Sequence, residues 1–541
     1  MLRPALLLAL ALSLAGLPLR AESLSDRAFQ AAQLAMLSSA GSAIRQAELR
    51  RSAGTGPLAD LLKARQRVAD RRARAEAELG ALGRDGTADT SAATRLSGEI
   101  DALSTEITQL ETRIAAEFPR FAEMTRPRPM TLAEVQAALA PEEGLLFIYT
   151  GARETHIWAI TPEHSAWQRI ELGEADIAAD VAALRLSLKA ASNARGAEAL
   201  KTLGQKPQIT PFDRTRAFLV YADLLSGVMP TLARTDQLYT VAQGPLTGIP
   251  LGLLVTDAPG DASQDGDPGA LRRTPWLFQR FALASLPTVE SLRAIAAPSR
   301  AQATPPTGRF LGIGAPKLTG GATGLRGVKM AGATADPESI RALAPLPGTL
   351  RELRAIATTL GAGPDALLTG DAAVEPALRS AGLEQAEIVV FATHGLLSGE
   401  LEGLAEPALV LTPPQVATAT DDGLLTASEI ADMTLTAEWV ILSACNTAGG
   451  DGRPDAEGLS GLARAFLVAG AKTLMVSHWP VRDDAAARLT TDAFAALEQP
   501  DIRHKSKALQ ASMQAMLEDE SDPTLAHPAA WAPFILVGDG R

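Results

Sequence analysis

The sequence predicts an α/β protein in which a mostly parallel sheet has helices on both faces and follows an all-helical N-terminal region. Three observations support this prediction. Residues 24–125 show helical periodicity only. From Pro141 onward, short apolar runs of strand length alternate with amphipathic segments. After residue 309 these runs are almost uninterrupted, which is typical of strands that are buried on both faces.

The first 21 residues have the pattern of a secretory signal peptide. Arg3 gives the positive start, a mostly apolar run covers 5–19, and Leu19-Arg20-Ala21 is an acceptable cleavage site before Glu22. A membrane-spanning helix needs roughly 20 apolar residues, so a retained anchor is the less favoured alternative. We therefore expect a periplasmic or secreted protein with no membrane span after signal removal.

Residues 22–125 are expected to form helices, two of which pair with each other. Breakers at 53–57 and 83–86 separate helices near 26–51, 58–82 and 96–114. The third helix carries a heptad seam, which consists of Leu96, Ile100, Leu103, Ile107, Leu110 and Ile114. We expect the second and third helices to form an antiparallel hairpin that docks on the body or on a partner helix. A longer coiled-coil dimer is the alternative.

The remainder divides into two α/β segments, 131–296 and 309–541, which are joined by a linker rich in Pro, Ala and Thr. In the first segment, the expected strands are 144–150, 156–161, 217–221, 237–243 and 281–285. In the second, they are 310–313, 387–392, 409–411, 439–443, 473–476 and 534–537. The helices of the second segment are expected at 349–360, 373–380, 426–433, 458–469, 482–497 and 505–518.

Two of these strands are followed by the residues that carry chemistry. His394 is the second residue after strand 387–392, and Cys445 is the second residue after strand 439–443. If the two strands are parallel neighbours, both side chains lie at one sheet edge, where ligands bind in such folds. An imidazole beside a thiol can take its proton and later protonate a leaving amine. The backbone N–H groups of Gly395 and Cys445 are candidate oxyanion donors. The alternative is a buried, inert thiol.

Six segments of the C-terminal half resemble, in order, those of CHAT domains, a branch of the caspase–separase group of cysteine peptidases. They are 391–395 (FATHG), 442–447 (LSACNT), 457–466 (EGLSGLARAF), 468–473 (VAGAKT), 479–483 (WPVRD) and 527–534 (HPAAWAPF). The resemblance implies a caspase-like α/β fold, with 309–541 as the catalytic half, 131–296 as a degenerate half, and His394 and Cys445 as the dyad. CHAT proteins often carry tetratricopeptide repeats in front, whereas residues 22–125 contain no 34-residue repeat.

Three acidic residues follow the predicted nucleophile closely: Asp451, Asp455 and Glu457. One interpretation is an acidic pocket for a basic P1 side chain. The other is a solvated loop in which Glu457 favours a helix N-terminus. His478 and His527 have no second nucleophile to serve, so we expect them to pack or to hydrogen-bond near the site.

Composition narrows the function classes. The net charge of −12 leaves no basic excess for sequence-independent nucleic-acid binding. Cys445 is the only cysteine of the sequence, which excludes an intrachain disulfide and a zinc site built from cysteines. Gly312-Ile-Gly314 is no dinucleotide fingerprint, because Lys317 stands where a third glycine is needed. We expect no metal and no cofactor.

The favoured interpretation is an exported caspase-like cysteine endopeptidase that cuts a protein substrate with the dyad of His394 and Cys445. The alternative is a non-catalytic scaffold, in which the N-terminal helices bind a protein partner.

Overall fold

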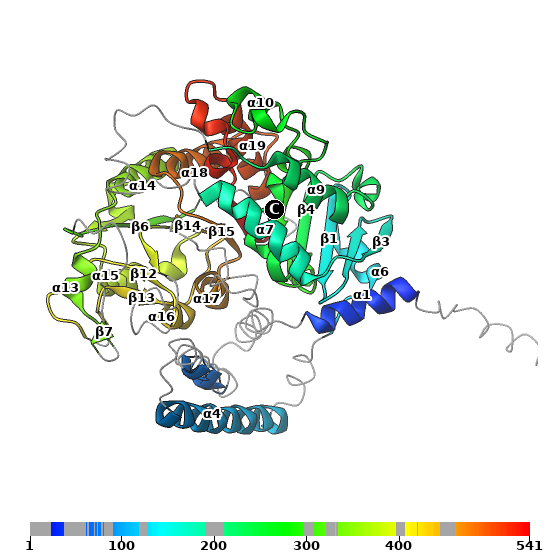
Figure 1. Cartoon of the computed structure of the whole chain (residues 1–541). Helices are drawn as coiled ribbons and strands as arrows, with labels where there is room; N and C mark the ends of the chain where they lie inside the picture. Colours follow the sequence, from blue (N-terminus) through cyan, green and yellow to red (C-terminus); the bar gives the residue numbers. More distant parts are fainter. Residues whose placement is uncertain are drawn as a thin grey trace, which may run out of the picture.

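The computed structural model describes a helical N-terminal part and an α/β body (Figure 1). The residues described are 23–36, most of 61–79, 90–117, 128–189, 210–296, 308–320, 330–331, 334–396, 406–418, 420–443 and 460–541. The predicted signal peptide lies outside them. Within the described part of the chain, no helix has the length and apolar character needed to cross a bilayer.

Eleven strands of the described body form one sheet. In spatial order they are β3 (Ser165–Ile170), β2 (Thr155–Ile160), β1 (Glu143–Thr150), β4 (Gln237–Ala242), β5 (Ala282–Ser285), β16 (Phe534–Gly538), β15 (Thr473–Ser477), β14 (Trp439–Leu442), β10 (Ile388–Ala392), β6 (Phe310–Pro316) and β9 (Leu367–Gly370).

The sheet contains two parallel groups that run in opposite directions. Strands β1, β4, β5 and β16 are parallel to one another, and so are β15, β14, β10, β6 and β9. The two groups meet where β15 pairs with β16 in antiparallel fashion. Strand β16 comes from the end of the chain and lies next to β5, so the sheet continues across both predicted α/β segments. The mostly parallel sheet that the sequence predicts is therefore confirmed.

Helices cover both faces of the second group because its strands are apolar on both sides. The side chains of Ile388, Val390 and Ala392 join one core, whereas those of Val389 and Phe391 join the other. The first core is covered by α14 (Pro347–Thr359), α18 (Asp483–Leu497) and α19 (Lys505–Glu518). The second is covered by α15 (Glu375–Ser380), α16 (Ala427–Asp432) and α17 (Gly461–Ala469), which lie on the opposite side of the sheet in Figure 1.

Two strand predictions need correction. Residues 217–221 belong to a helix, α9 (Arg214–Leu224), in which Asp213 caps the first turn and the buried Ala217, Val220 and Leu224 follow the helical period. Residues 409–411 were expected in the main sheet. Strand β12 (Ala408–Val410) instead lies between β11 (Gly395–Leu396) and β13 (Leu424–Thr426) in a small antiparallel sheet.

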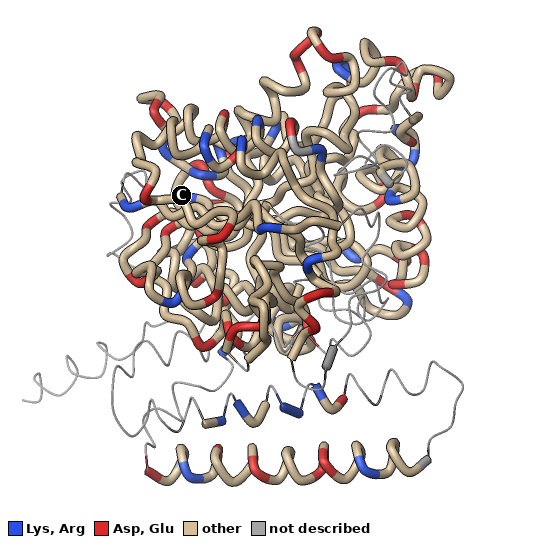
Figure 2. Tube along the Cα trace, turned by 90° about the vertical axis from the view of Figure 1, so that its left-hand side faces the viewer, with Lys and Arg blue, Asp and Glu red and all other residues tan. Residues whose placement is uncertain are grey.

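The predicted antiparallel hairpin of helices is present. Described residues between 61 and 79 are helical and pack against α4 (Thr90–Glu117) through a cluster of Val68, Leu103 and Ile107. Arg71 pairs with Glu106 at 3.0 Å, and Arg65 pairs with Glu111, so the partners run in opposite order along the two helices. Figure 2 shows both signs of charge along α4. The hairpin touches the body through Arg74 and Glu406, 3.8 Å apart.

Helix α1 (Leu24–Ala35) docks separately on the first part of the sheet. The ring of Phe29 is fully buried, and its centroid lies 5.3 Å from that of Phe147 and 5.6 Å from that of Trp158. The Asp26 carboxylate accepts a hydrogen bond from the backbone N–H of Leu132. The remainder of the helix predicted at 26–51 lies outside the described residues.

Gly314 allows β6 to approach the end of β10 closely. A Cβ atom at this position would lie 2.1 Å from the carbonyl oxygen of Ala392, a backbone atom that cannot rotate away. Gly314 is therefore required for strand packing just before His394. This contact gives the Gly312-Ile-Gly314 pattern a structural reason.

We predict that Gly314→Ala lowers the free energy of unfolding by about 1–3 kcal/mol, because the added methyl group forces two paired strands apart. Urea denaturation monitored by circular dichroism measures the change. Gly363→Ala is the matched control, since its φ is −77° and a Cβ there would meet no atom within 4 Å. Equal effects of the two substitutions would contradict the prediction.

Candidate functional site

The backbone around His394 is held at the carboxyl end of β10 by bonds to β12. The buried Thr393 hydroxyl donates to the carbonyl oxygen of Val410 at 2.6 Å. The Val410 N–H in turn donates to the carbonyl oxygen of His394 at 2.9 Å. These two hydrogen bonds, from residues 393 and 394, therefore hold the chain after β10 against β12, which limits where the imidazole can lie.

The imidazole itself is oriented by a backbone carbonyl. Its Nε2 atom lies 2.9 Å from the carbonyl oxygen of Ala344, in the segment before α14. A carbonyl oxygen only accepts, so Nε2 carries the hydrogen and donates. In the neutral ring, Nδ1 is then the nitrogen with the lone pair. This is the tautomer that a base acting through Nδ1 requires.

The strands that precede His394 and Cys445 are parallel neighbours, as the sequence predicts. Phe391 is paired with Leu442, and the Ser443 N–H donates to the Phe391 carbonyl oxygen at 2.9 Å. His394 follows its paired residue by three positions, and Cys445 follows its own by three. Cys445 itself lies outside the described residues, two positions beyond Ser443.

Gly395 occupies a position that suits a hydrogen-bond donor. It is paired with Leu409 in the small antiparallel sheet. Because the Val410 N–H donates to His394, the pair of Gly395 and Leu409 is of the non-hydrogen-bonded type. The Gly395 N–H therefore points away from β12 rather than into the ladder.

Helix α14 supplies a buried carboxylate that sequence reasoning missed. Glu352 is 1% exposed, and its Oε2 atom accepts a hydrogen bond from the Ser443 hydroxyl at 3.1 Å. The signal was its spacing: Glu352 falls on the buried face of α14 that also carries Thr349, Leu353 and Ile356. The loop before this helix orients the imidazole, and the helix itself bonds to the end of β14.

The acidic residues predicted for substrate binding, Asp451, Asp455 and Glu457, lie outside the described residues. Among those described, no group of three or more His, Cys, Asp or Glu side chains is arranged to hold a metal ion.

His478 and His527, the two histidines that were expected to pack or to hydrogen-bond near the site, are buried. His527 Nδ1 accepts a hydrogen bond from the Ala529 N–H at 3.1 Å, as the sequence interpretation allowed, and burial lowers its pKa to about 4. His478 is 2% exposed, and neither of its ring nitrogens has a hydrogen-bond partner in the described structure. Burial, assisted by the charge of Arg185, lowers the pKa of His478 to about 3, so the ring is neutral.

A model of the CHAT domain matches residues 217–539, which include β4, β5 and β16 of the first parallel group, the whole second group and the predicted dyad. The chain belongs to the CHAT domain family. The resemblance drawn from the six sequence segments is thereby confirmed.

Two curated proteins are similar to this CHAT chain. Tetratricopeptide repeat protein 28 of Mus musculus is 30% identical over 365 residues, and the Homo sapiens protein of that name is 29% identical over 365 residues. Each match covers 59% of this chain but only 13% of the relative. The chain therefore corresponds to a small part of these longer proteins.

Solved structures that are similar to this one include two complexes. The Saccharomyces cerevisiae separase–securin complex aligns with a TM-score of 0.41 and 9% identity, covering 75% of this chain and 30% of the other. The complex of Porphyromonas gingivalis RgpB pro- and mature domains aligns with a TM-score of 0.32 and 13% identity, covering 68% and 76%.

We predict that the neutral His478 makes the CHAT domain sensitive to acid. The unfolded histidine binds a proton below its ordinary pKa of 6.5, whereas the folded one does so only near pH 3. Stability must therefore fall as the pH drops from 6.5 toward 3, by about 2 kcal/mol at pH 5. Unfolding free energies at about pH 7 and pH 5 measure this loss.

His478→Phe should reduce that loss by the same amount, because the phenyl ring does not titrate. His164→Gln, which replaces an exposed histidine, is the control and should retain the full loss. If wild type and His478→Phe lose equal stability on acidification, the claim that His478 is buried in its neutral form is refuted.

Proposed function

We propose that the protein is an exported caspase-like cysteine endopeptidase that cuts a protein substrate, with Cys445 as the nucleophile and His394 as the general base and acid. One observation carries the proposal. The paired residues Phe391 and Leu442 of two parallel strands are each followed, three positions later, by His394 and by Cys445, the only cysteine of the sequence. The Nε2 atom of His394 already donates to a carbonyl oxygen. The signal-like segment 1–21 supports export.

The proposed reaction uses groups of this chain alone. His394 Nδ1 accepts the proton of the Cys445 thiol, and the thiolate forms a bond to the scissile carbonyl carbon. The N–H groups of Gly395 and Cys445 donate to the oxyanion. As the C–N bond breaks, His394 gives the proton to the leaving amine. Water, activated by the same imidazole, then hydrolyses the thioester and frees the thiol.

The tautomer inferred for His394 fits this sequence of steps. Donation from Nε2 to Ala344 leaves Nδ1 as the basic atom, and the carbonyl stabilises the imidazolium that forms when Nδ1 is protonated. The Gly395 N–H points away from β12, and this orientation lets it donate to the carbonyl oxygen of a substrate.

Digestion of a peptide library derived from a whole proteome tests the proposal. We expect the purified chain to produce cuts that Cys445→Ala abolishes and that His394→Ala slows by about 100-fold or more, the usual loss on removing a general base. His164→Ala is the matched control and should cut like wild type. Cuts that persist in Cys445→Ala, or no cuts by wild type with or without activating partners, would overturn it.

A non-catalytic scaffold is the second candidate, and two observations favour it. The curated relatives are named for tetratricopeptide repeats, and a helical hairpin precedes the α/β body here. In that case the hairpin would bind a protein partner, and Cys445→Ala and His394→Ala would bind it as well as wild type does.

We further propose that Asp451, Asp455 and Glu457 select a basic P1 side chain. Alanine at any of these positions should reduce cutting after Arg or Lys by about ten- to a hundredfold, because a charge-assisted contact is lost. Cutting after other residues should change little. Asp501→Ala, at an exposed position after α18, is the control. Equal cleavage after acidic and basic residues by wild type would contradict the proposal.

A further inference from the structure

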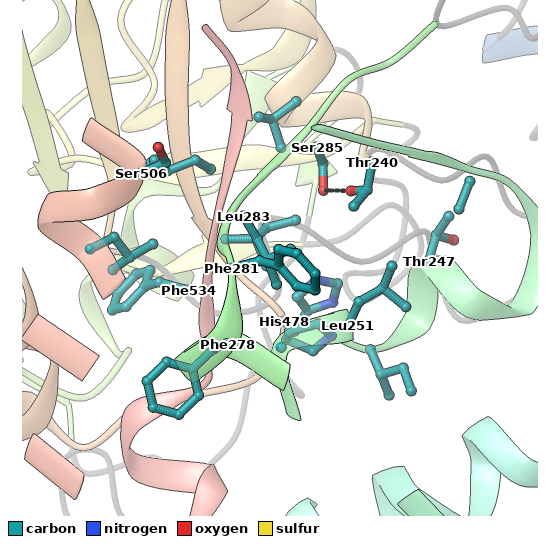
Figure 3. Close-up of a pocket in the computed structure, with 18 of the residues that line it drawn as sticks. Thr240, Thr247, Leu251, Phe278, Phe281, Leu283, Ser285, His478, Ser506 and Phe534 are labelled. Carbon is teal, nitrogen blue, oxygen red and sulfur yellow. Dashed lines mark hydrogen bonds between the residues drawn. The ribbon is translucent and has the colours of Figure 1, made fainter. Parts of the chain in front are cut away.

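A cavity of about 120 Å³ lies within the body, against one face of the first parallel group of strands. Its wall is formed by β4, β5 and β16, by helix α19, and by the segment 246–252 that follows β4. None of the described residues that line it is Asp, Glu, Lys or Arg. Most of the wall is apolar, and its large side chains are Leu246, Ile249, Phe278, Phe281, Leu283 and Phe534 (Figure 3).

Strand β5 turns one of its faces toward this cavity. It lies inside the sheet, since β4 pairs with it on one side and β16 on the other. Along the strand, Ala282 and Ala284 are buried, whereas Leu283 and Ser285 are half-buried and line the cavity. Alternate residues of a strand point to opposite faces, so the accessible surface lies on the face that carries Leu283 and Ser285. The side chain of Ser285 consists of Cβ and a hydroxyl group alone, and it therefore opens into the cavity.

The hydroxyl groups of Ser285 and Thr240 form a polar pair in this wall (Figure 3). Their oxygen atoms lie 3.2 Å apart, so one hydroxyl donates to the other. Two hydroxyl groups carry two hydrogen atoms, and this bond uses one of them. The second hydrogen atom has no acceptor among the described residues. A donor in apolar surroundings is unfavourable without an acceptor, so the pair can serve an oxygen atom of a bound molecule.

The other polar side chains of the wall are engaged within the protein. The hydroxyl groups of Thr247 and Ser506 each donate to a backbone carbonyl oxygen. The amides of Gln243 and Gln510 do the same. Both ring nitrogens of His478 are buried, so this residue offers the cavity no polar atom. Of the hydroxyl groups that the described wall contains, only the pair on β4 and β5 therefore retains a hydrogen atom for a ligand.

The wall specifies the class of ligand. A charged molecule would lose its hydration here without gaining a charged partner. An apolar cavity of roughly 150 Å³ holds a benzene ring, so this smaller cavity suits a single ring. A carbonyl oxygen accepts the spare hydrogen atom and brings no donor of its own. We propose that the cavity binds a small, uncharged, mostly apolar molecule of about one ring, whose carbonyl oxygen accepts a hydrogen bond from the pair of Ser285 and Thr240. This site is independent of the proposed peptidase reaction.

Calorimetric titration of the full chain with cyclopentanone and with methylenecyclopentane tests the proposal. The two probes share one ring and differ by an oxygen atom in place of a CH₂ group. Thr240→Val/Ser285→Ala removes both hydroxyl groups and should bind cyclopentanone about tenfold more weakly than wild type does, because the carbonyl oxygen loses its donor. Methylenecyclopentane should bind the variant at least as tightly as wild type. Thr105→Val/Ser380→Ala makes the same changes at exposed hydroxyl groups and should bind both probes like wild type.

A measurement on wild type alone guards against a variant that does not fold. In NMR spectra of methyl-labelled protein, cyclopentanone should shift the resonances of Thr240 and Leu283 and leave that of the exposed Thr105 in place. Equal losses of affinity for the two probes in Thr240→Val/Ser285→Ala would overturn the proposal, since the hydroxyl groups would then act only through the shape of the cavity. So would unchanged resonances of Thr240 and Leu283, or a crystal structure grown with cyclopentanone in which only water contacts the hydroxyl pair.

Discussion

The parallel pairing of β10 with β14 is the constraint on which the rest of this protein depends. Both strands are buried on both faces, and their side chains alternate between two cores. A shift of one residue in either strand would exchange those sets, so the register is strongly determined. The pairing of Phe391 with Leu442 then sets where the chain leaves each strand. The segments that carry His394 and Cys445 therefore begin at neighbouring points of one sheet edge.

Helix α14 connects this packing to the polar groups at the edge. Leu353 and Ile356 lie in the core beneath the sheet, Glu352 accepts the Ser443 hydroxyl, and the segment before the helix presents the Ala344 carbonyl to the imidazole. The same helix therefore stabilises the fold and orients the site. A substitution on the buried face of α14 should therefore change both the stability of the fold and the orientation of the imidazole.

The sequence predicted the sheet because strands that are buried on both faces appear in a sequence as short apolar runs. It predicted that His394 and Cys445 share one edge because neighbouring parallel strands end at the same edge of a sheet. It failed at 217–221, where five apolar residues fit a strand or a helix equally well, and the cap at Asp213 decided for the helix. Glu352 and the Ala344 carbonyl were missed because their roles depend on contacts between distant segments. The burial of His478 was hidden for the same reason, because it depends on segments that are distant in the sequence.

The reactivity of the single thiol tests the central claim, that His394 and Cys445 act at one edge, most directly. The rate of iodoacetamide labelling is measured against pH in wild type, His394→Ala and the control His164→Ala. A neighbouring imidazolium lowers a thiol pKa, so wild type and the control should react rapidly at about pH 6–7, and His394→Ala slowly. Slow labelling of native wild type that His394→Ala leaves unchanged, with and without activating partners, would contradict the account.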